Sequence, residues 1–347
     1  MALAPTSTVT TGVRKKRVMA GMRPTGKLHV GHLLGALQNF VALSREAECF
    51  YEVADLHALT TKFDRSSEIA DDIREMVIDW LAAGVDPQAC TIYVQSRIPE
   101  ISEMVVLLSM MTPVSWLERV PTYKEQIVEL GPEIATHGFL GYPVLQAVDI
   151  AIVRGEGVPV GRDQLPHLEL TREIVRRFNH LYGPVLVEPS PILSNTPLVP
   201  GADGRKMSKS YDNSILLADS EQITTEKVRR MFTDPTKIHK NDPGHPETCP
   251  VFFFHEAFNA VAADGIAHRC RAGLLGCVEN KADMAKHLNA ALAPFRERRR
   301  RLEASPSIVD EILDEGSKRA RDVARQTLDG VRAAMGLSGS SARRQAV

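Results

Sequence analysis

Two histidines stand three residues apart where a predicted helix begins, in the stretch PTGKLHVGHLLGAL of residues 24–37. At that spacing the rings of His29 and His32 lie on one side of the first turn, and Gly31 lets a ligand approach the backbone closely. The N-terminus of a helix adds free N–H groups and the positive end of the helix dipole. The pattern therefore predicts an anion site with two donors suited to a triphosphate. The same sequence pattern is also compatible with two surface histidines in a loop. A metal site with two histidine ligands is a further alternative, although no third ligand lies nearby in the sequence.

A second stretch, GADGRKMSKSYDNS of residues 201–214, carries two lysines among small and flexible residues. Lysines on such a loop can fold over a phosphate chain and follow charge as it develops in a transition state. Lys206 and Lys209 are therefore predicted to act on the same triphosphate as the histidines. Neither G-x-x-x-x-G-K-[ST] nor G-x-G-x-x-G occurs in the chain, so a P-loop and a dinucleotide site have no support.

Apolar, strand-like segments alternate with amphipathic helical segments at the start of the chain. This order predicts a Rossmann-like, doubly wound α/β domain whose parallel strands are joined by crossover helices. Ligands of such sheets bind beyond the carboxyl ends of the strands, where the turn before the two histidines lies. The predicted strands are 17–22, 48–55 and 90–96, and the predicted helices are 31–47, 68–84 and 101–111.

The pattern changes after residue 183. Residues 184–206 are rich in Pro, Gly, Ser and Asn and predict a long ordered loop. The segments after that loop have helical periodicity, so the second part of the chain is predicted to be all-α. The predicted organisation is a disordered tail at 1–17, a catalytic domain at 18–215, a helical domain at 216–307, a C-terminal helix at 308–337 that packs back on the catalytic domain, and a disordered tail at 338–347.

The composition excludes several classes of protein. No run of 18 apolar residues exists, so no membrane span is expected. Five cysteines, an odd number thinly spread, favour a reducing compartment over a disulfide framework, and we expect a cytoplasmic protein. The formal net charge is −1, so a nucleic-acid partner needs a local basic patch. FRERRRRL at 295–302 is the candidate patch, although a solvated helix face could have the same row of arginines.

H-x-G-H after a first strand, followed by K-M-S-K-S at residues 206–210, resembles the class I aminoacyl-tRNA synthetases. We call residues 29–32 the first signature and residues 206–210 the second. In that family the carboxylate of an amino acid attacks the α-phosphate of ATP, and the aminoacyl group then passes to tRNA. The segments AGMRPTGKLHVGH, VADLHALT, LERVPTYKE, YPVLQAVDI and GVPVGRDQLPHLELTREIVRRFN resemble the tryptophanyl branch of the tryptophanyl/tyrosyl subgroup, so the resemblance covers roughly 18–337.

The resemblance implies a role for each matched residue. His32 stands where many tryptophanyl enzymes have Asn, and Arg162 replaces a usual acidic residue. Mg²⁺ would accompany ATP, held mainly by phosphate oxygens and water. The implied catalytic residues are His29, His32, Lys124, Lys206 and Lys209; the implied ATP-binding residues are Arg23, Pro24, Thr25, Gly31, His32, Gly161, Arg162, Asp163, Gln164, Lys206, Met207, Ser208, Lys209 and Ser210.

Asp149 is the predicted reader of the amino-acid side chain. It sits in the apolar run VLQAVDIAIV, where an unpaired carboxylate is costly. Such a carboxylate can accept an indole N–H or a phenol O–H, although it could instead cap a turn or pair with Arg154. The resemblance assigns the same pocket to Tyr142, Gln146, His57, Met19, Val158 and Val160. The Y-x-x-x-Q-x-x-D spacing also resembles the tyrosyl pattern, whereas the two valines favour tryptophan.

Three cysteines fall in the helical part, where some relatives carry four that bind an iron–sulfur cluster. They are Cys249, Cys270 and Cys277, and Asn280 occupies the position of the fourth. Four thiolates are the usual requirement for such a cluster. We therefore expect no protein-bound metal and no iron–sulfur cluster.

The resemblance also implies partners. They are L-tryptophan, tRNA(Trp) and a second copy of the chain. The apolar segment 102–123 is the candidate dimer interface, and a plain buried core helix is the alternative for it. A nucleotidylyltransferase is one alternative, and it does not need the second signature. A synthetase-like paralogue with a binding or regulatory role is the other, although no position of the catalytic motifs is lost. The predicted phosphate contacts are Arg229, Arg230, Arg296, Arg298, Arg299, Arg300 and Arg301.

Overall fold

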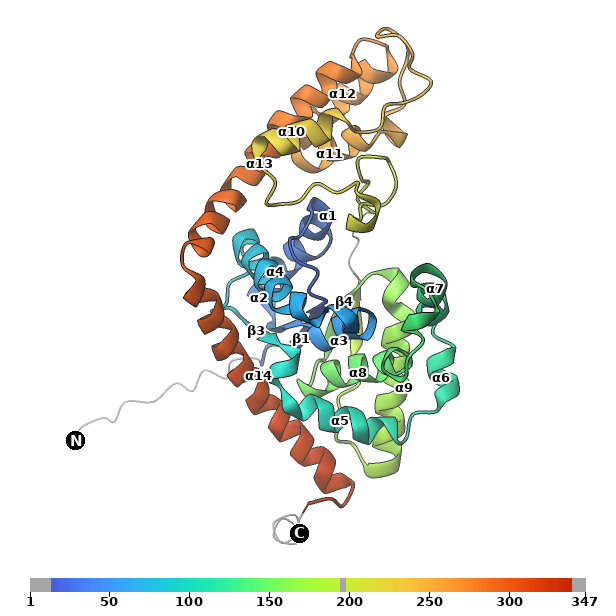
Figure 1. Ribbon diagram of the computed structural model, residues 1–347, viewed down its shortest axis with the longest axis vertical. Coiled ribbons are helices and arrows are strands. Elements are labelled where there is room, and N and C mark those ends of the chain that lie inside the picture. The colour runs from blue at the N-terminus through green and yellow to red at the C-terminus, as the bar shows by residue number, and fades with distance from the viewer. Residues whose placement is uncertain (1–13, 194–197, 339–347) are drawn as a thin grey trace, which may run out of the picture.

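The computed structural model describes residues 14–193 and 198–338. Its centre is a five-stranded sheet with the order β3-β2-β1-β4-β5, and every pair of neighbouring strands is parallel. The doubly wound α/β architecture predicted from the sequence is confirmed. The strands are β1 (Arg17–Met22), β2 (Glu48–Val53), β3 (Cys90–Val94), β4 (Gly157–Val160) and β5 (Ser190–Leu193) (Figure 1).

β5 corrects one prediction, because it lies inside the segment 184–206 that the composition assigns to a loop. Three of its four residues are exposed, so the alternation of apolar and polar residues that identifies a half-buried strand is missing. Pro191 is tolerated there because β5 is an edge strand.

One face of the sheet is covered by the helices that follow β1 and β2. They are α1 (Val30–His32), α2 (Gln38–Glu46) and α4 (Ile69–Ala83), whereas α3 (Asp55–Lys62), directly after β2, packs mainly on the helices of the opposite face. Residues 33–37 form a turn of π-helix between α1 and α2, so the predicted helix 31–47 is locally widened directly after the first signature. Gly84 ends α4 in the left-handed region, at φ 105°.

The opposite face carries α5 (Pro99–Ser109), α8 (His137–Ile152) and α9 (Leu165–Tyr182), with the shorter α6 (Val114–Glu118) and α7 (Pro121–Leu130) beside them. Thr136 caps α8 by accepting a hydrogen bond from the Phe139 backbone N–H at 3.1 Å. Tyr142, Gln146 and Asp149 follow at helical spacing, so α8 presents them on one stripe.

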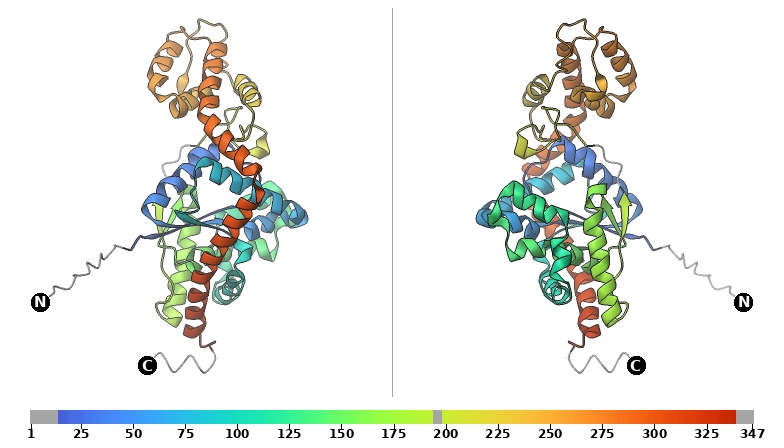
Figure 2. Two further views of the ribbon diagram at one scale, coloured as in Figure 1. Left: turned by 90° about the vertical axis from the view of Figure 1, so that its left-hand side faces the viewer. Right: turned by 90° about the vertical axis from the view of Figure 1, so that its right-hand side faces the viewer.

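The C-terminal part is helical, as predicted. α10 (Glu221–Arg229), α11 (Pro250–Phe258), α12 (Ala260–Arg271) and the first half of α13 (Cys277–Glu303) gather at the top of Figure 1. α13 then runs down to α14 (Pro306–Ala334), and both views of Figure 2 show this pair extending along the α/β part. α14 lies against β3 and so covers one edge of the sheet.

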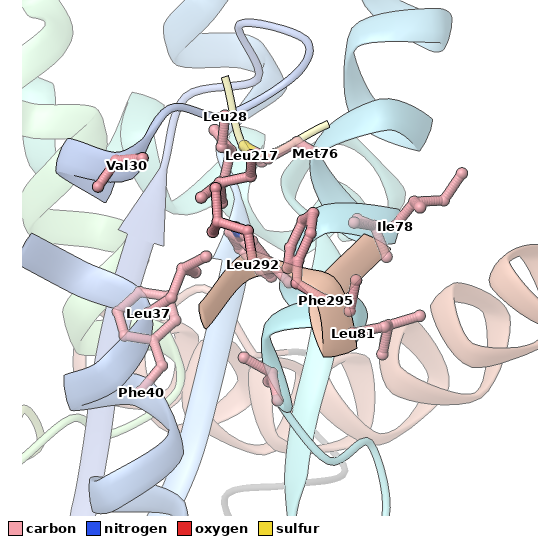
Figure 3. Close-up of a cluster of buried hydrophobic side chains, with 14 of the residues drawn as sticks. Leu28, Val30, Leu37, Phe40, Met76, Ile78, Leu81, Leu217, Leu292 and Phe295 are labelled. Atoms are coloured by element: carbon pink, nitrogen blue, oxygen red, sulfur yellow. The ribbon is translucent and has the colours of Figure 1, made fainter. Parts of the chain in front are cut away.

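A single cluster of buried side chains joins the first signature to the helical part. Leu28 and Val30, on either side of His29, pack with Leu217 and with Leu292 and Phe295 of α13 (Figure 3). The segments that carry these side chains are therefore held together by one apolar core, although they are far apart in the sequence.

No helix within the described ranges is long and apolar enough to cross a membrane. The tails predicted at 1–17 and 338–347 fall mostly outside the described residues, which begin at 14 and end at 338. Arg14 already pairs with Glu156 at 2.8 Å, and Arg17 begins β1.

Candidate active site

The two signatures lie side by side because the segment after the second pairs with the backbone of the first. The Val30 N–H donates to the Ile215 carbonyl at 2.9 Å, and the Leu217 N–H donates to the Leu28 carbonyl at 2.8 Å. His29 and Leu216 form an antiparallel bridge between these bonds. The loop that carries the predicted lysines is therefore anchored beside the predicted anion site.

Lys209 reaches the turn before the first signature. Its ammonium group donates to the backbone oxygen of Thr25 and lies 3.3 Å from Thr25 Oγ1. Lys206 is exposed, as is Ser210, whereas Met207 is buried and its N–H donates to Val199 O at 2.9 Å. The structure thus brings one predicted lysine to the site and leaves the other on the surface of the loop.

The first signature holds its two imidazoles against each other. The ring centroids of His29 and His32 are 3.8 Å apart, and the His29 backbone N–H donates to His32 Nδ1 at 3.2 Å. A Cβ on Gly31 would lie 2.9 Å from the His29 ring, which explains the glycine between them. Burial, and then the charge of Lys209, lowers the pKa of His29 to about 4. Burial, His29 and Lys209 lower the pKa of His32 to about 3.

A cavity of about 460 Å³ opens at the carboxyl ends of β1 and β4. This is the place that a doubly wound sheet offers to a ligand. Of the residues predicted for ATP or the amino acid, those that line the cavity are Met19, Arg23, His57, Tyr142, Gln146, Val158, Val160, Gly161 and Gln164.

Asp149, the predicted reader of the side chain, lies behind the cavity wall rather than in it. It is 2% exposed and does not line the cavity. Its Oδ2 is 2.9 Å from His57 Nε2, and the Gln95 amide donates to Oδ1 at 2.8 Å and to Oδ2 at 2.9 Å. The alternative of a pair with Arg154 is wrong, because the Arg154 guanidinium instead donates to Thr327 Oγ1 at 3.1 Å.

Other predicted residues stand near the cavity without lining it. Lys124 is exposed on α7, whose Thr122 and Gln126 line the cavity instead. Arg162 and Asp163 are exposed in the turn after β4. Pro24 is buried, and Ser208 caps the turn after it by accepting a hydrogen bond from the Ser210 N–H at 3.3 Å.

Several lining residues were missed by sequence reasoning. Tyr142 Oη is 2.7 Å from His167 Nε2, and the Phe139 ring stacks on Tyr142 with centroids 5.4 Å apart. Glu52, on β2, is 1% exposed and lines the cavity. A glutamate inside the apolar strand ECFYEV was the available signal for Glu52, and it is the same signal that singled out Asp149.

The three helical-part cysteines and Asn280 line one small cavity, of about 20 Å³, together with Lys281. The Lys281 ammonium group donates to the Met231 carbonyl and to Thr233 Oγ1, both at 2.7 Å. An amide does not replace a thiolate, so this residue set does not fit a four-cysteine cluster. In the described part of the chain no group of three or more His, Cys, Asp or Glu side chains is arranged to hold a metal ion.

The arginines predicted to meet phosphates divide into two groups. Arg299 is 3% exposed and binds Glu75 and Asp79 of α4, so it serves the fold. Arg298 donates to the Ala82 carbonyl at 2.6 Å, and Arg296 donates to Thr224 Oγ1 at 2.9 Å. The side chains classed as exposed are those of Arg229, Arg230, Arg298, Arg300 and Arg301.

A parallel doubly wound sheet, adjacent H-x-G-H and K-M-S-K-S segments and a cavity at the strand ends together define a class I aminoacyl-tRNA synthetase. The sequence model of the family described as "tRNA synthetases class I (W and Y)" matches residues 12–293. The chain belongs to this family.

Relatives in the tryptophanyl branch match almost the whole chain. The tryptophan–tRNA ligase of Thermotoga maritima is 50% identical over 325 residues, which cover 92% of this chain and 99% of the relative. That of Aquifex aeolicus is 44% identical, with 92% of this chain and all of the relative covered. The crystal structure of the Campylobacter jejuni tryptophanyl-tRNA synthetase complexed with ADP and tryptophan has a TM-score of 0.84 at 31% identity, covering 92% of this chain and 100% of that one.

Proposed function

We propose that this protein is a tryptophan–tRNA ligase that forms tryptophanyl-adenylate from L-tryptophan and ATP and then transfers tryptophan to tRNA(Trp). The observation that carries the proposal is the pairing of the two signatures beside a cavity, in a chain 50% identical to a tryptophan–tRNA ligase. A nucleotidylyltransferase needs neither the second signature nor the helical part. A regulatory paralogue has no need to keep both signatures in contact.

The chemistry needs positioning and charge stabilisation rather than a covalent enzyme intermediate. The substrate carboxylate attacks the α-phosphate, a phosphorus–oxygen bond forms, and pyrophosphate leaves with its electron pair. His29 and His32 offer N–H donors to the triphosphate, and Lys209 stabilises the charge that develops on the leaving pyrophosphate. Mg²⁺ would arrive with ATP and be held mainly by phosphate oxygens and water.

The cavity wall suits a large aromatic amino acid. Val158, Val160 and Met19 supply apolar surface, and Tyr142 with Gln146 supplies polar atoms for the α-ammonium group. Tyrosine is the competing substrate, because the same polar residues also resemble the tyrosyl pattern. The valines and the tryptophanyl relatives favour tryptophan.

Pyrophosphate exchange tests the proposal. We expect labelled pyrophosphate to enter ATP only when tryptophan is present, because the exchange requires reversible formation of the adenylate. Tyrosine in a parallel reaction should give no more than background exchange. Exchange with tyrosine alone would assign the other specificity, and no exchange with either amino acid would favour a paralogue without activity.

The working unit of the proposed enzyme is a homodimer. Val106, Met110 and Val114, within the candidate interface 102–123, are 54%, 75% and 57% exposed, and Val128 nearby is 87% exposed. They adjoin an apolar cavity of about 420 Å³ between α5 and α8. Exposed apolar side chains at this density are typical of a protein interface. Sedimentation should give the dimer mass, and Met110→Glu should shift it toward the monomer.

The helical part, residues 216–307 of the predicted organisation, is proposed to bind the anticodon end of the tRNA. Its exposed arginines, Arg229, Arg230, Arg298, Arg300 and Arg301, are the phosphate contacts that remain. Binding through them should weaken as salt concentration rises. Residues 18–215 would hold ATP and tryptophan, 308–337 would brace that domain, and the cytoplasm is the expected location.

A further inference from the structure

The last residue of α3 is a lysine that lies near the turn before the first signature. Thr60 of α3 lines the cavity, and so does Arg23, whose guanidinium group donates to Thr61 Oγ1. Lys62 follows these two threonines and is partly exposed. The end of α3 is therefore held against the residues that lead from β1 to the first signature, and Lys62 belongs to neither signature.

Lys62 pairs with Asp72, which lies in the first turn of α4. The Lys62 ammonium nitrogen is 3.4 Å from Asp72 Oδ2. The other carboxylate oxygen lies beside the turn, since a Cβ added at Gly26 would be 2.8 Å from Asp72 Oδ1. Both side chains of the pair are partly exposed. The Asp72 carboxylate therefore contacts Lys62 and the turn at the same time, in a place that solvent reaches.

Lys209 of the second signature reaches the same turn from the other side of the sequence. Its ammonium group donates to the backbone oxygen of Thr25. Burial lowers the pKa of Lys209, whereas the charge of Asp72 raises it and that of Lys62 lowers it. The two ammonium groups are thus close enough to repel each other, and the Asp72 carboxylate offsets this repulsion.

The second carboxylate that acts on the charge of Lys209 is that of Asp79, and its oxygens are already bound. Asp79 is fully buried, its Oδ2 accepts the Leu28 N–H at 2.6 Å, and its Oδ1 binds Arg299. Of these two carboxylates, Asp72 is therefore the one that a ligand can reach. A polyphosphate carries more negative charge than a carboxylate and can replace it as the partner of the lysines.

We propose that Lys62 binds the terminal phosphates of ATP together with Lys209, and that Asp72 is a positioning residue whose carboxylate holds Lys62 until the triphosphate takes its place. This inference rests on the proposed function. The α-phosphate must lie at the cavity, where the amino-acid carboxylate attacks it. The β- and γ-phosphates then extend from the cavity toward the turn, where the two ammonium groups converge.

Binding of ATP and AMP tests the role of Lys62, because AMP lacks the terminal phosphates. In calorimetry, Lys62→Gln should weaken ATP binding by about 5- to 30-fold and AMP binding by less than about twofold. In pyrophosphate exchange, Lys62→Gln should raise KM for ATP and leave KM for tryptophan unchanged. Arg65→Gln, a change of the same charge in the exposed turn after α3, is the control that leaves both nucleotide affinities unchanged.

Asp72→Asn should have the opposite effect on ATP. Without the competing carboxylate, ATP binding should tighten by about two- to fivefold, while AMP binding is unaffected. Asp71→Asn is the matched control, because Asp71 is an exposed residue of the same first turn and has the same interaction with the helix dipole. The gain from Asp72→Asn should be smaller in a protein that also carries Lys62→Gln, because the lysine that it frees is absent.

Four results would overturn the inference. They are unchanged ATP binding in Lys62→Gln, an equal loss for ATP and AMP, weaker ATP binding in Asp72→Asn, and a gain from Asp72→Asn that is the same with and without Lys62. The proposed function fails separately. If the unaltered protein shows no tryptophan-dependent exchange but Lys62→Gln selectively weakens ATP binding, the phosphate site is supported and the ligase activity is refuted.

Discussion

The ammonium group of Lys209 contacts the backbone oxygen of Thr25 and lies 3.3 Å from Thr25 Oγ1. This contact joins the second signature to the turn before the first. The charge of the ammonium group also acts on both imidazoles of the first signature, where it lowers their pKa values. In the proposed reaction a phosphate oxygen would replace Thr25 as the partner of this lysine.

Lys209→Ala should slow adenylate formation without weakening tryptophan binding. In the proposed mechanism the lysine stabilises charge that develops on the leaving pyrophosphate, so its loss should lower the single-turnover rate by about 10²-fold or more, or about 3 kcal/mol of barrier. Rapid-quench measurement of adenylate formation checks the rate, and tryptophan fluorescence checks binding. Arg205→Ala is the matched control, since Arg205 is a cation of the same loop that pairs with Asp203 at 2.6 Å. An unchanged rate for Lys209→Ala would remove the assigned role.

ATP binding should be accompanied by proton uptake. The pKa of His29 is lowered to about 4 and that of His32 to about 3, first by burial, so both rings are neutral in the protein without ligand. A triphosphate beside them favours the charged form and raises both pKa values. Protons should therefore bind with ATP, more at pH 6 than at pH 8, and affinity should increase as the pH falls across that range.

Calorimetry in buffers of different ionisation enthalpy measures this uptake. The γ-phosphate of ATP titrates in the same range, so the comparison is with His32→Asn, which retains a donor but removes one imidazole. The variant should take up fewer protons at pH 6. Equal uptake in both proteins would assign all of it to the nucleotide.

The sequence predicted those parts of the molecule that depend on local pattern. The apolar, strand-like runs 17–22, 48–55 and 90–96 identified β1, β2 and β3, and Gly84 marked the end of α4. β5 escaped because an exposed edge strand has no apolar alternation. Helical spacing does not reveal which side of α7 faces the cavity. The sequence therefore could not show that Thr122 and Gln126 line the cavity whereas Lys124 does not.

Contacts between residues far apart in the chain could not be predicted from the sequence, because they depend on how the helices pack. Arg299 reads as one of a row of surface arginines, and only the packing of α13 on α4 makes it a buried partner of Asp79. Asp149 was correctly singled out as a costly carboxylate, but the residues that satisfy it, His57 and Gln95, lie 92 and 54 positions away. Glu52 of β2 is a second buried carboxyl group at the cavity, and a glutamate inside an apolar strand was its available signal.

Gly316→Ala should destabilise the protein by detaching α14 from β3. A Cβ at this position would lie 1.7 Å from the Ile92 carbonyl oxygen, so helix and strand must separate. The neighbouring contacts, such as the Arg319 guanidinium donating to the Cys90 carbonyl at 3.3 Å, would lengthen. We expect a loss of about 1–3 kcal/mol or more in the free energy of unfolding, measured in urea.

Gly265→Ala is the control for that change, because a Cβ there meets nothing within 4 Å. Gly265 lies inside α12, where alanine should stabilise the helix by about 0.5–1 kcal/mol. Opposite signs for the changes in unfolding free energy would show that Gly316 is required because helix and strand approach closely there, and not because of helix propensity. A stability gain in both would contradict the packing of α14 described above.

Arg299 links the helical part to the first signature through Asp79. Arg299 of α13 binds one Asp79 oxygen, and the other oxygen accepts the Leu28 backbone N–H at 2.6 Å, directly before His29. Arg299→Met would leave Asp79 buried without its cation, so unfolding should become easier by about 3–5 kcal/mol. Arg300→Met, on the exposed side of the same helix, should change stability by less than about 0.5 kcal/mol.

The loss in Arg299→Met should depend on pH with a definite sign. Burial raises the pKa of Asp79 to about 6 while Arg299 opposes the shift, so removing the arginine raises it further. A carboxyl group whose pKa is higher in the folded state than in the unfolded state is tolerated when protonated, and this stabilisation is lost as the pH rises through the folded pKa. Urea unfolding should therefore show a larger penalty at pH 8 than at pH 5. An equal loss of unfolding free energy at both pH values would mean that Arg299→Met destabilises the protein through lost packing. In that case the charge of Asp79 would not connect α13 to the first signature.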